Sequence, residues 1–268
     1  YGHGCNIGAN HANGESIIFL NTDVKMEPNW LEEFVKTAES DPSIGVCGCK
    51  VLRLDDKRID CIGGFVVDLW GYGLMPVGHL EKDAGQYDGV SDVFAIAGMC
   101  MLVRKSVFEK VGGFDERFFL LVEDIDLCWR IRLAGYNIKV NPKAIIYHKS
   151  MATFKKEKIT KPNVRLLVER NTLSTLIKNY GNKKLLIILP QNLSLLLVEI
   201  ITFIFTGNLN LAISDVKAVI WNLRNLRSTL YLRKRVNQTR RVTDDTIQRK
   251  MIRKSLKVIK FRDLLKTL

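Results

Sequence analysis

The second half of this chain is poor in carboxylates and contains no cysteine. Residues 151–268 hold 25 Lys and Arg against 7 Asp and Glu, a net charge of +18, whereas residues 1–150 hold 16 against 21, a net charge of −5. No two cysteines form a CxxC pair; they are Cys5, Cys47, Cys49, Cys61, Cys100 and Cys128. We therefore expect no disulfide framework, and we predict buried, reduced thiols in a cytosolic protein.

The excess of cations indicates that the second half contacts an anionic partner. Residues 209–232 place apolar side chains at three- and four-residue steps with Lys and Arg between them, which is typical of a basic amphipathic helix. This half lacks the exposed aromatics interleaved with basic residues that characterise nucleic-acid binders. We predict an anionic membrane surface as the partner, and no nucleic acid.

The run 185–205 is mostly apolar and long enough to cross a bilayer, which needs about 20 residues. Pro190-Gln191-Asn192 and Glu199 interrupt it, and a charge at the bilayer centre is costly. We predict peripheral or monotopic attachment at the cytoplasmic face of the cell membrane. A true span and a soluble helical bundle are the alternatives.

Residues 1–154 alternate between candidate strands and helices, which predicts an α/β domain with a mixed sheet. The predicted strands cover 17–20, 43–54, 95–103, 138–140 and 144–147, and the predicted helices 28–39, 104–111 and 124–134. Residues 1–14 are rich in Gly and Asn and predict a polar loop that runs into a short helix. Residues 59–92 form a Gly-rich irregular excursion. The basic residues 155–268 form a second, helical region with helices at 164–180 and 209–232.

A carboxylate follows the first predicted strand directly, in the order Asn21-Thr22-Asp23. The carboxyl edge of an open α/β sheet is where ligands bind. Mg²⁺ prefers oxygen ligands and keeps several waters, so one or two carboxylates plus substrate phosphates bind it. We predict Asp23 as a metal ligand. The alternative is that Asp23 lies in a turn or caps the next segment.

Three carboxylates, Glu123, Asp124 and Asp126, crowd the start of the helix that ends before Gly135. A sugar hydroxyl is a poor nucleophile until a base removes its proton, and an ionised carboxylate can do so. We predict Asp124 as this base. The alternative is that all three acids only stabilise the helix dipole.

Two further residues are candidates for the same site. His148 follows a predicted strand and could complete the coordination begun by Asp23 and two phosphates, although a lone His is more often a surface or core residue. Gly98 permits close approach of the backbone to a ligand, and simple strand packing is its alternative.

Four blocks of the sequence, in order, resemble glycosyltransferase family 2, and in particular its rhamnosyltransferase-like branch. They are Asn21–Val24, Ala97–Arg104, Val111–Phe119 and Glu123–Arg130. The segment Gly2–Asn10 also resembles the Asn/Gly-rich loop of that branch. The blocks cover roughly residues 1–150, and their shared order makes the signal specific.

The resemblance implies a GT-A fold and an inverting transfer of a sugar from a nucleotide-diphosphate donor, with Mg²⁺ or Mn²⁺ as cofactor. The branch implies rhamnose or another deoxysugar, and as acceptor a hydroxyl of a cell-surface polysaccharide or of a lipid-linked glycan.

The same resemblance assigns roles to single residues. Asp23 matches the family's metal-binding carboxylate, Asp124 its catalytic base, and His148 a metal-binding His. Glu123 is then expected to position the acceptor. The donor is expected near the remaining matched positions, which are Gly2, Asn6, Asn21, Asp23 and Gly98.

The chain opens at Tyr1 without an initiator methionine. In the family, strands that hold the nucleobase precede the Asn/Gly-rich loop, so we expect this stretch to begin within a longer protein and to be inactive alone. The alternative function is a non-catalytic peripheral membrane-binding module in which the acidic residues only cap helices.

Overall fold

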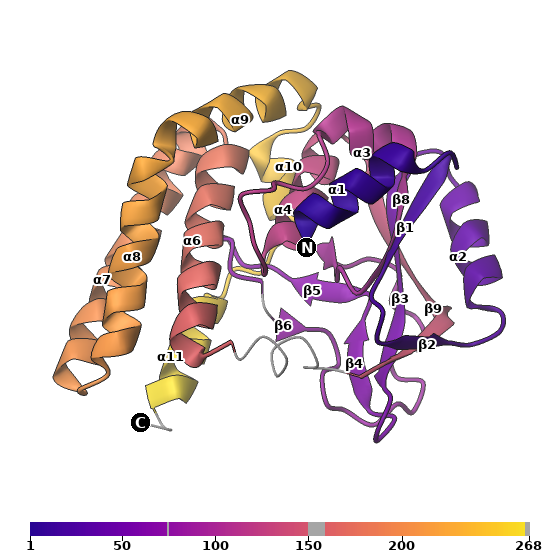
Figure 1. The fold of residues 1–268 in the computed structure, drawn as a ribbon, viewed down its shortest axis with the longest axis horizontal. Coiled ribbons are helices and arrows are strands. Elements are labelled where there is room, and N and C mark those ends of the chain that lie inside the picture. Colours follow the sequence, from indigo (N-terminus) through magenta and orange to yellow (C-terminus); the bar gives the residue numbers. More distant parts are fainter. Residues whose placement is uncertain (74, 150–158, 266–268) are drawn as a thin grey trace.

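The computed structural model describes residues 1–73, 75–149 and 159–265, and the predicted boundary between residues 154 and 155 lies outside these ranges. A mixed sheet with flanking helices forms one side of the molecule, and long helices form the other (Figure 1). The sheet order is β1 (Ser16–Leu20), β8 (Cys100–Arg104), β3 (Ile44–Arg53), β9 (Asn137–His148), β2 (Val24–Met26), and β4 (Ile59–Ile62) also pairs with β3. Only β3 and β9 pair in parallel among these strands, so the prediction of a mixed α/β sheet is confirmed.

The central strand β3 is buried on both faces because its alternating side chains enter two different layers. Val46 packs in the cluster that includes Ile131 of α4 (Glu123–Leu133), and Cys47 packs in the cluster that includes Phe34 of α2 (Trp30–Glu39). All six cysteines are free and five are buried, as predicted. The helix predicted at 104–111 is α3 (Lys105–Val111), which ends at Gly112 in the left-handed conformation.

The predicted strand 95–103 is wrong as a single element. Residues Ala95–Ile96 form β7, which joins β5 (Gly64–Val66) and β6 (Met75–Pro76) in a separate small sheet, whereas β8 belongs to the large sheet. A turn at 97–99 separates β7 from β8. The Gly-rich excursion supplies β5, the strand that pairs with β7. Glycine at position 64 permits this close pairing, because a Cβ there would come within 2.1 Å of the Ala95 carbonyl oxygen.

Two further elements differ from the predictions. Residues 138–140 and 144–147 belong to one strand, β9, whose register against β3 shifts between Cys49 and Lys50. Residues Gly2–His11 form a helix, α1, in place of a polar loop, and its Asn6 side chain bonds the backbone of Phe114 in both directions, at 2.9 and 3.0 Å. Local composition does not reveal this distant contact.

The second half is helical, as predicted, and its elements are α6 (Lys161–Asn179), α7 (Asn182–Phe205), α8 (Leu209–Arg224), α9 (Leu226–Thr239), α10 (Asp244–Gln248) and α11 (Leu256–Leu265). The predicted helix 209–232 is in fact α8 and α9, which meet at Asn225. The Asn225 side chain donates to the Trp221 carbonyl at 2.8 Å, and such local side-chain bonds compete with continuation of a helix.

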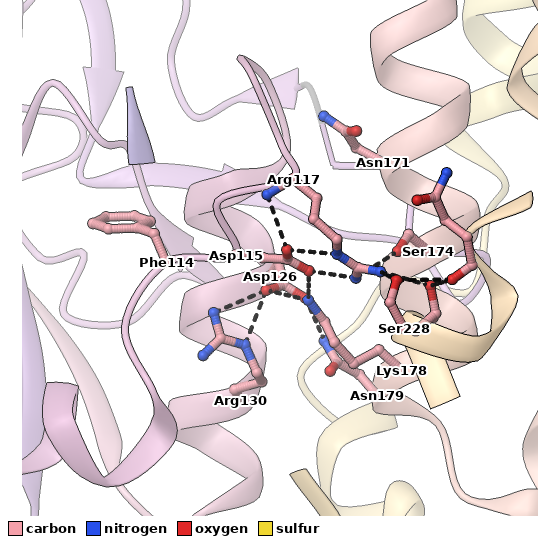
Figure 2. Close-up of polar contacts among 12 residues, drawn as sticks. Phe114, Asp115, Arg117, Asp126, Arg130, Asn171, Ser174, Lys178, Asn179 and Ser228 are labelled. Carbon is pink, nitrogen blue, oxygen red and sulfur yellow. Dashed lines mark hydrogen bonds and ion pairs between the residues drawn. The ribbon is translucent and has the colours of Figure 1, made fainter. Parts of the chain in front are cut away.

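The two halves share a core. The Trp129 ring on α4 packs edge-on against Tyr180, which follows α6, with 4.9 Å between ring centroids. The Lys178 ammonium donates to Asp115 at 2.6 Å and to Asp126 at 2.9 Å (Figure 2). The long helices therefore help to fix the start of α4.

Candidate active site

A cavity of about 400 Å³ lies where four predicted site segments meet. Asn21 reaches it from the end of β1, Gly98 from the turn between β7 and β8, and His148 from the end of β9, while Glu123 and Asp124 line it from the start of α4. These residues are far apart in the sequence, and the sheet brings them together. Asp23 is joined to the group through His148, with 3.5 Å between its Oδ1 and the His148 Nε2.

Asp124 is buried, and it accepts two backbone hydrogen bonds. Its Oδ2 accepts from the Gly98 N–H at 3.0 Å and its Oδ1 from the Ile125 N–H at 2.8 Å. Burial raises the pKa of Asp124 above its ordinary value, and these two donors oppose that shift because they favour the ionised form. The turn at Gly98 therefore holds the carboxylate in place and supports its charge.

Glu123 lies beside Asp124 and has fewer partners. It is buried, and its Oε2 has no hydrogen-bond partner among the described residues. Burial and then the charge of Asp124 raise the pKa of Glu123. The arrangement favours an ionised Asp124 beside a protonated Glu123, which leaves one acceptor and one donor group at the cavity wall.

The backbone that leads into α4 is strained. Leu121 and Val122 both have positive φ values, 70° and 72°, in the left-handed region that side chains other than glycine seldom adopt. The buried Asn171 side chain of α6 donates to the carbonyls of Leu120 and Leu121, at 3.1 and 2.7 Å. Such strain costs about 1–3 kcal/mol per residue and persists only where surrounding contacts hold it, typically at functional sites.

His148 lies between two carboxylates. Its Nδ1 pairs with the Asp60 Oδ2 at 2.8 Å, and its Nε2 faces Asp23. Asp60 lies on β4 and is buried. A carboxylate on one ring nitrogen orients the imidazole so that the other nitrogen can bind a metal.

The residues present fit a divalent cation with an incomplete protein shell. Carboxylate oxygen and imidazole nitrogen suit Mn²⁺, and the Asp60–His148 pair supplies the supporting contact that metal-bound histidines have. Within the described ranges, no cluster of three or more His, Cys, Asp and Glu side chains is arranged to hold a metal ion. Phosphate oxygens and waters would have to complete the coordination.

Two predicted donor-site residues lie elsewhere. Neither Gly2 nor Asn6 lines this cavity. A Cβ at Gly2 would meet Phe114 at 3.0 Å, and the Asn6 amide is used on Phe114 and Glu116. The structure gives both a packing role, because α1 replaces the predicted loop.

The third acid of the helix start, Asp126, also lies away from the cavity. It pairs with Lys178 and with Arg130, whose Nε donates at 2.9 Å (Figure 2). In the same cluster, burial alone would raise the pKa of Asp115, but the Lys178 ammonium and the Arg117 guanidinium hold it below its ordinary value. The first turn of α4 thus directs Glu123 and Asp124 toward the cavity and Asp126 toward the ion cluster.

Sequence reasoning missed three contributors: Asp60, Asn171 and Tyr1, whose hydroxyl donates to the Gly98 carbonyl at 2.5 Å. Asp60 sits in an apolar strand between Ile59 and Cys61, and a lone acid in a buried strand was the available signal. Asn171 carries no such signal, because a mid-helix Asn is ordinarily solvent-exposed.

Comparisons with known proteins concern the family of the chain. The model of the family described as glycosyltransferase-like family 2 matches residues 2–161. The O-antigen biosynthesis protein RfbC of Myxococcus xanthus is 31% identical over 152 residues, which cover 54% of this chain and 12% of that protein. The rhamnosyltransferase WbbL of Escherichia coli K12 is 32% identical over 156 residues, which cover 53% of this chain and 58% of that protein.

A shorter match lies in the N-acetylglucosaminyl-diphospho-decaprenol L-rhamnosyltransferase of Mycobacterium tuberculosis, with 44% identity over 59 residues, 22% of this chain and 19% of that protein. Among solved structures, GalNAc-T7 with UDP, GalNAc and Mn²⁺ aligns with a TM-score of 0.47 and 15% identity, over 68% of this chain and 35% of that chain. The chain spans between 12% and 58% of the length of these three curated relatives.

Proposed function

The chain belongs to glycosyltransferase-like family 2, and from this membership we propose that its cavity serves the transfer of a sugar from a nucleotide-diphosphate donor to an acceptor hydroxyl. The observation that carries the proposal is the position of Asp124. It is a buried carboxylate, held by the Gly98 N–H, at the wall of a cavity that also contains Asn21 and His148.

In the proposed reaction, Asp124 accepts the proton of the acceptor hydroxyl as the oxygen attacks the anomeric carbon of the donor sugar. The nucleoside diphosphate leaves from the opposite face, so a single displacement inverts the configuration at that carbon. Protonated Glu123 donates a hydrogen bond that positions the acceptor. The strained turn at Leu121 and Val122 aims both carboxyl groups into the cavity.

Asp23 and His148 would hold Mg²⁺ or Mn²⁺ beside the donor diphosphate, with Asp60 orienting the imidazole. When bound, the cation neutralises the charge that develops on the leaving diphosphate. Asn21 and the Gly98 turn border the same cavity and would contact the donor.

The names of the relatives support a narrower proposal for substrates. Two of the three are called rhamnosyltransferases, and the name of one of these two specifies N-acetylglucosaminyl-diphospho-decaprenol. The third is called an O-antigen biosynthesis protein. We propose rhamnose or another deoxysugar as the transferred group. The acceptor is then a hydroxyl of a cell-surface polysaccharide or of a lipid-linked glycan.

The non-catalytic alternative, a membrane-binding module, predicts that the acids serve only as helix caps. Two observations favour the enzyme. Asp23 and His148 lie on elements other than α4, and the strain at Leu121 and Val122 gives no benefit to a simple cap.

Calorimetry on the whole protein tests the metal and donor part of this proposal. Mn²⁺-dependent binding of a rhamnose donor is expected to disappear in Asp23→Ala and to weaken by about 10–100-fold in Asp60→Asn, because Asp60 orients the ligand His148. Glu32→Gln, an exposed first-turn acid of α2, is the matched control and should bind as the wild type does. Donor affinity unaffected by a chelator or by Asp23→Ala would contradict the assignment.

A further inference from the structure

Helices α7 and α8 form an antiparallel hairpin that packs beside α6 (Figure 1). The buried residues of this hairpin include Asn192 and Glu199 on α7 and Asp215 and Asn222 on α8. Apolar Ile188, Leu196 and Phe203 of α7 are buried beside them. The buried side of the hairpin is therefore mixed, and it takes the acids of both helices away from the outer side.

An ion network accounts for the buried acids. Arg165 of α6 donates to Glu199 and to Asp215, both at 2.7 Å. Lys257 of α11 donates to Glu169 at 2.6 Å and pairs with Glu199 at 3.1 Å. Glu199 interrupts the apolar run 185–205 in the sequence, but in the structure it points inward and is paired.

The outer side of the hairpin is apolar and exposed. We define the outer face by Leu197, Ile201 and Phe205 on α7 and by Leu209, Ile213 and Ile220 on α8, which are between 41% and 86% exposed. Between Lys184 and Lys217 the sequence has only two charged residues, Glu199 and Asp215, and both are buried. The outer face therefore carries no charge over this stretch.

Length and composition agree with a lipid contact. Helix α7 is the one described helix long and apolar enough to cross a membrane, and 22% of its most apolar window is buried inside the molecule. Its 24 residues extend about 36 Å. Because Glu199 and Asp215 are tied to Arg165 of α6, a crossing would have to break the packing of α7 and α8 on the rest of the molecule.

The exposed charges that α7, α8 and the first turn of α9 carry beside the outer face are positive. Lys183 precedes it, Lys217 lies between Ile213 and Ile220, and Arg224 and Arg227 follow Ile220, all exposed. A second copy docked on this face would bring two such basic borders together, whereas an anionic lipid surface would attract them. Long basic side chains also keep their charge at the headgroups while their stems cover apolar surface.

We propose that the outer face of the α7–α8 hairpin lies in the interface of an anionic membrane, as a monotopic element that does not cross it. The inward ion network removes the two acids from the lipid side, and the basic border contacts the headgroups. This inference does not depend on the proposed sugar transfer, because it concerns a surface outside the cavity.

Vesicle flotation of the purified chain tests the inference with a matched pair of variants. Ile213 is 48% exposed on α8 and Leu31 is 47% exposed on α2, so a glutamate at either position has the same room. On phosphatidylcholine vesicles containing phosphatidylglycerol, Ile213→Glu should partition about tenfold less than the wild type, whereas Leu31→Glu should float unchanged. Leu197→Gln is the second outer-face variant, and thermal melting checks that each variant is folded.

A second vesicle experiment tests the basic residues that border the outer face. The double variant Arg224→Gln, Arg227→Gln should bind less to vesicles with phosphatidylglycerol and show no change on pure phosphatidylcholine. Equal flotation of Ile213→Glu and Leu31→Glu would overturn the proposal. So would a stable dimer in sedimentation without lipid that Ile213→Glu dissociates, since that assigns the face to a second copy. Protection of a cysteine at position 208 from an impermeant reagent added outside would mean that the hairpin crosses the bilayer.

Discussion

Burial distinguishes Asp124 and Glu123 from ordinary acids at a helix start. Exposed first-turn acids such as Glu32 only interact with the helix dipole. Asp124 and Glu123 are buried side by side, and burial raises the pKa of each. This difference converts a common capping pattern into a candidate acid–base pair.

The raised pKa of Asp124 predicts a pH dependence. The base works in its ionised form, so the rate of sugar transfer should rise with pH as Asp124 loses its proton. Because the pKa of Asp124 is raised, this rise should occur at a higher pH than an ordinary aspartate, with a pKa of about 3.9, would give. The profile of kcat/KM against pH in the whole protein measures this. A rate that is already maximal at pH 4.5 would contradict the assignment.

At this scale, the sequence predicted Asp23, Asn21, Gly98, Glu123, Asp124 and His148, and the structure brings these together. It did not predict Asp60, because pairing of Asp60 with His148 depends on β4 and β9 both lying beside β3. Gly2 and Asn6 were placed in the wrong environment for a related reason. Their partner, Phe114, is more than a hundred residues away in the chain.

At the scale of elements, α6 controls the geometry of the cavity wall. Asn171 satisfies two carbonyls in the strained turn before α4, and Lys178 holds Asp126 one turn into the helix. Sequence patterns predicted the existence of α4 and α6. They could not predict this contact, because hydrogen bonds between a mid-helix Asn and a distant turn leave no periodic pattern in the sequence.

The two hydrogen bonds of Asn171 predict the effect of Asn171→Ala. The variant leaves the part-buried carbonyls of Leu120 and Leu121 without this donor, which should lower the free energy of unfolding by about 1–3 kcal/mol. Urea titration measures the loss, and amide exchange should speed up at residues 120–124. Asn210→Ala, an exposed site on α8, is the control. Unchanged exchange in this turn would show that other contacts hold the strain.

Element boundaries follow the same division. Long periodic segments such as α2, β3 and α6 were predicted to within a few residues. The break between β7 and β8 and the break at Asn225 were missed, because each results from a neighbour or a local side-chain bond within an otherwise continuous apolar pattern. The helix α1 was missed because contacts with Phe114 and Glu116, and not its own composition, stabilise it.

At the scale of the whole molecule, the acidic and basic halves are joined by a buried ion cluster. Lys178 is 1% exposed and contacts both Asp115 and Asp126 (Figure 2). The ammonium depresses the pKa of Asp115, so this pair contributes stability above the ordinary aspartate pKa and loses it as the pH falls below that range.

Lys178→Met should therefore destabilise the protein strongly at neutral pH. Removing the cation leaves Asp115 with Arg117 and Asp126 with Arg130 but takes away the ammonium that both carboxylates share, at a cost of about 3–5 kcal/mol in the free energy of unfolding. The deficit should shrink as the pH falls, because the less compensated carboxylates of the variant take up protons. Lys184→Met, which removes a surface pair with Asp245, should cost far less in the same denaturant titration. Equal losses would show that the cluster does not join the two halves.

The most direct measurement of the central claim is turnover by Asp124→Asn in the whole protein, at saturating donor and acceptor. Asparagine preserves the size of the side chain and an oxygen for the Gly98 N–H, but it cannot accept the acceptor proton. The account predicts a folded protein with unchanged donor affinity and with turnover reduced about 10²–10⁴-fold. Near-normal transfer by a folded, donor-binding Asp124→Asn protein would contradict it.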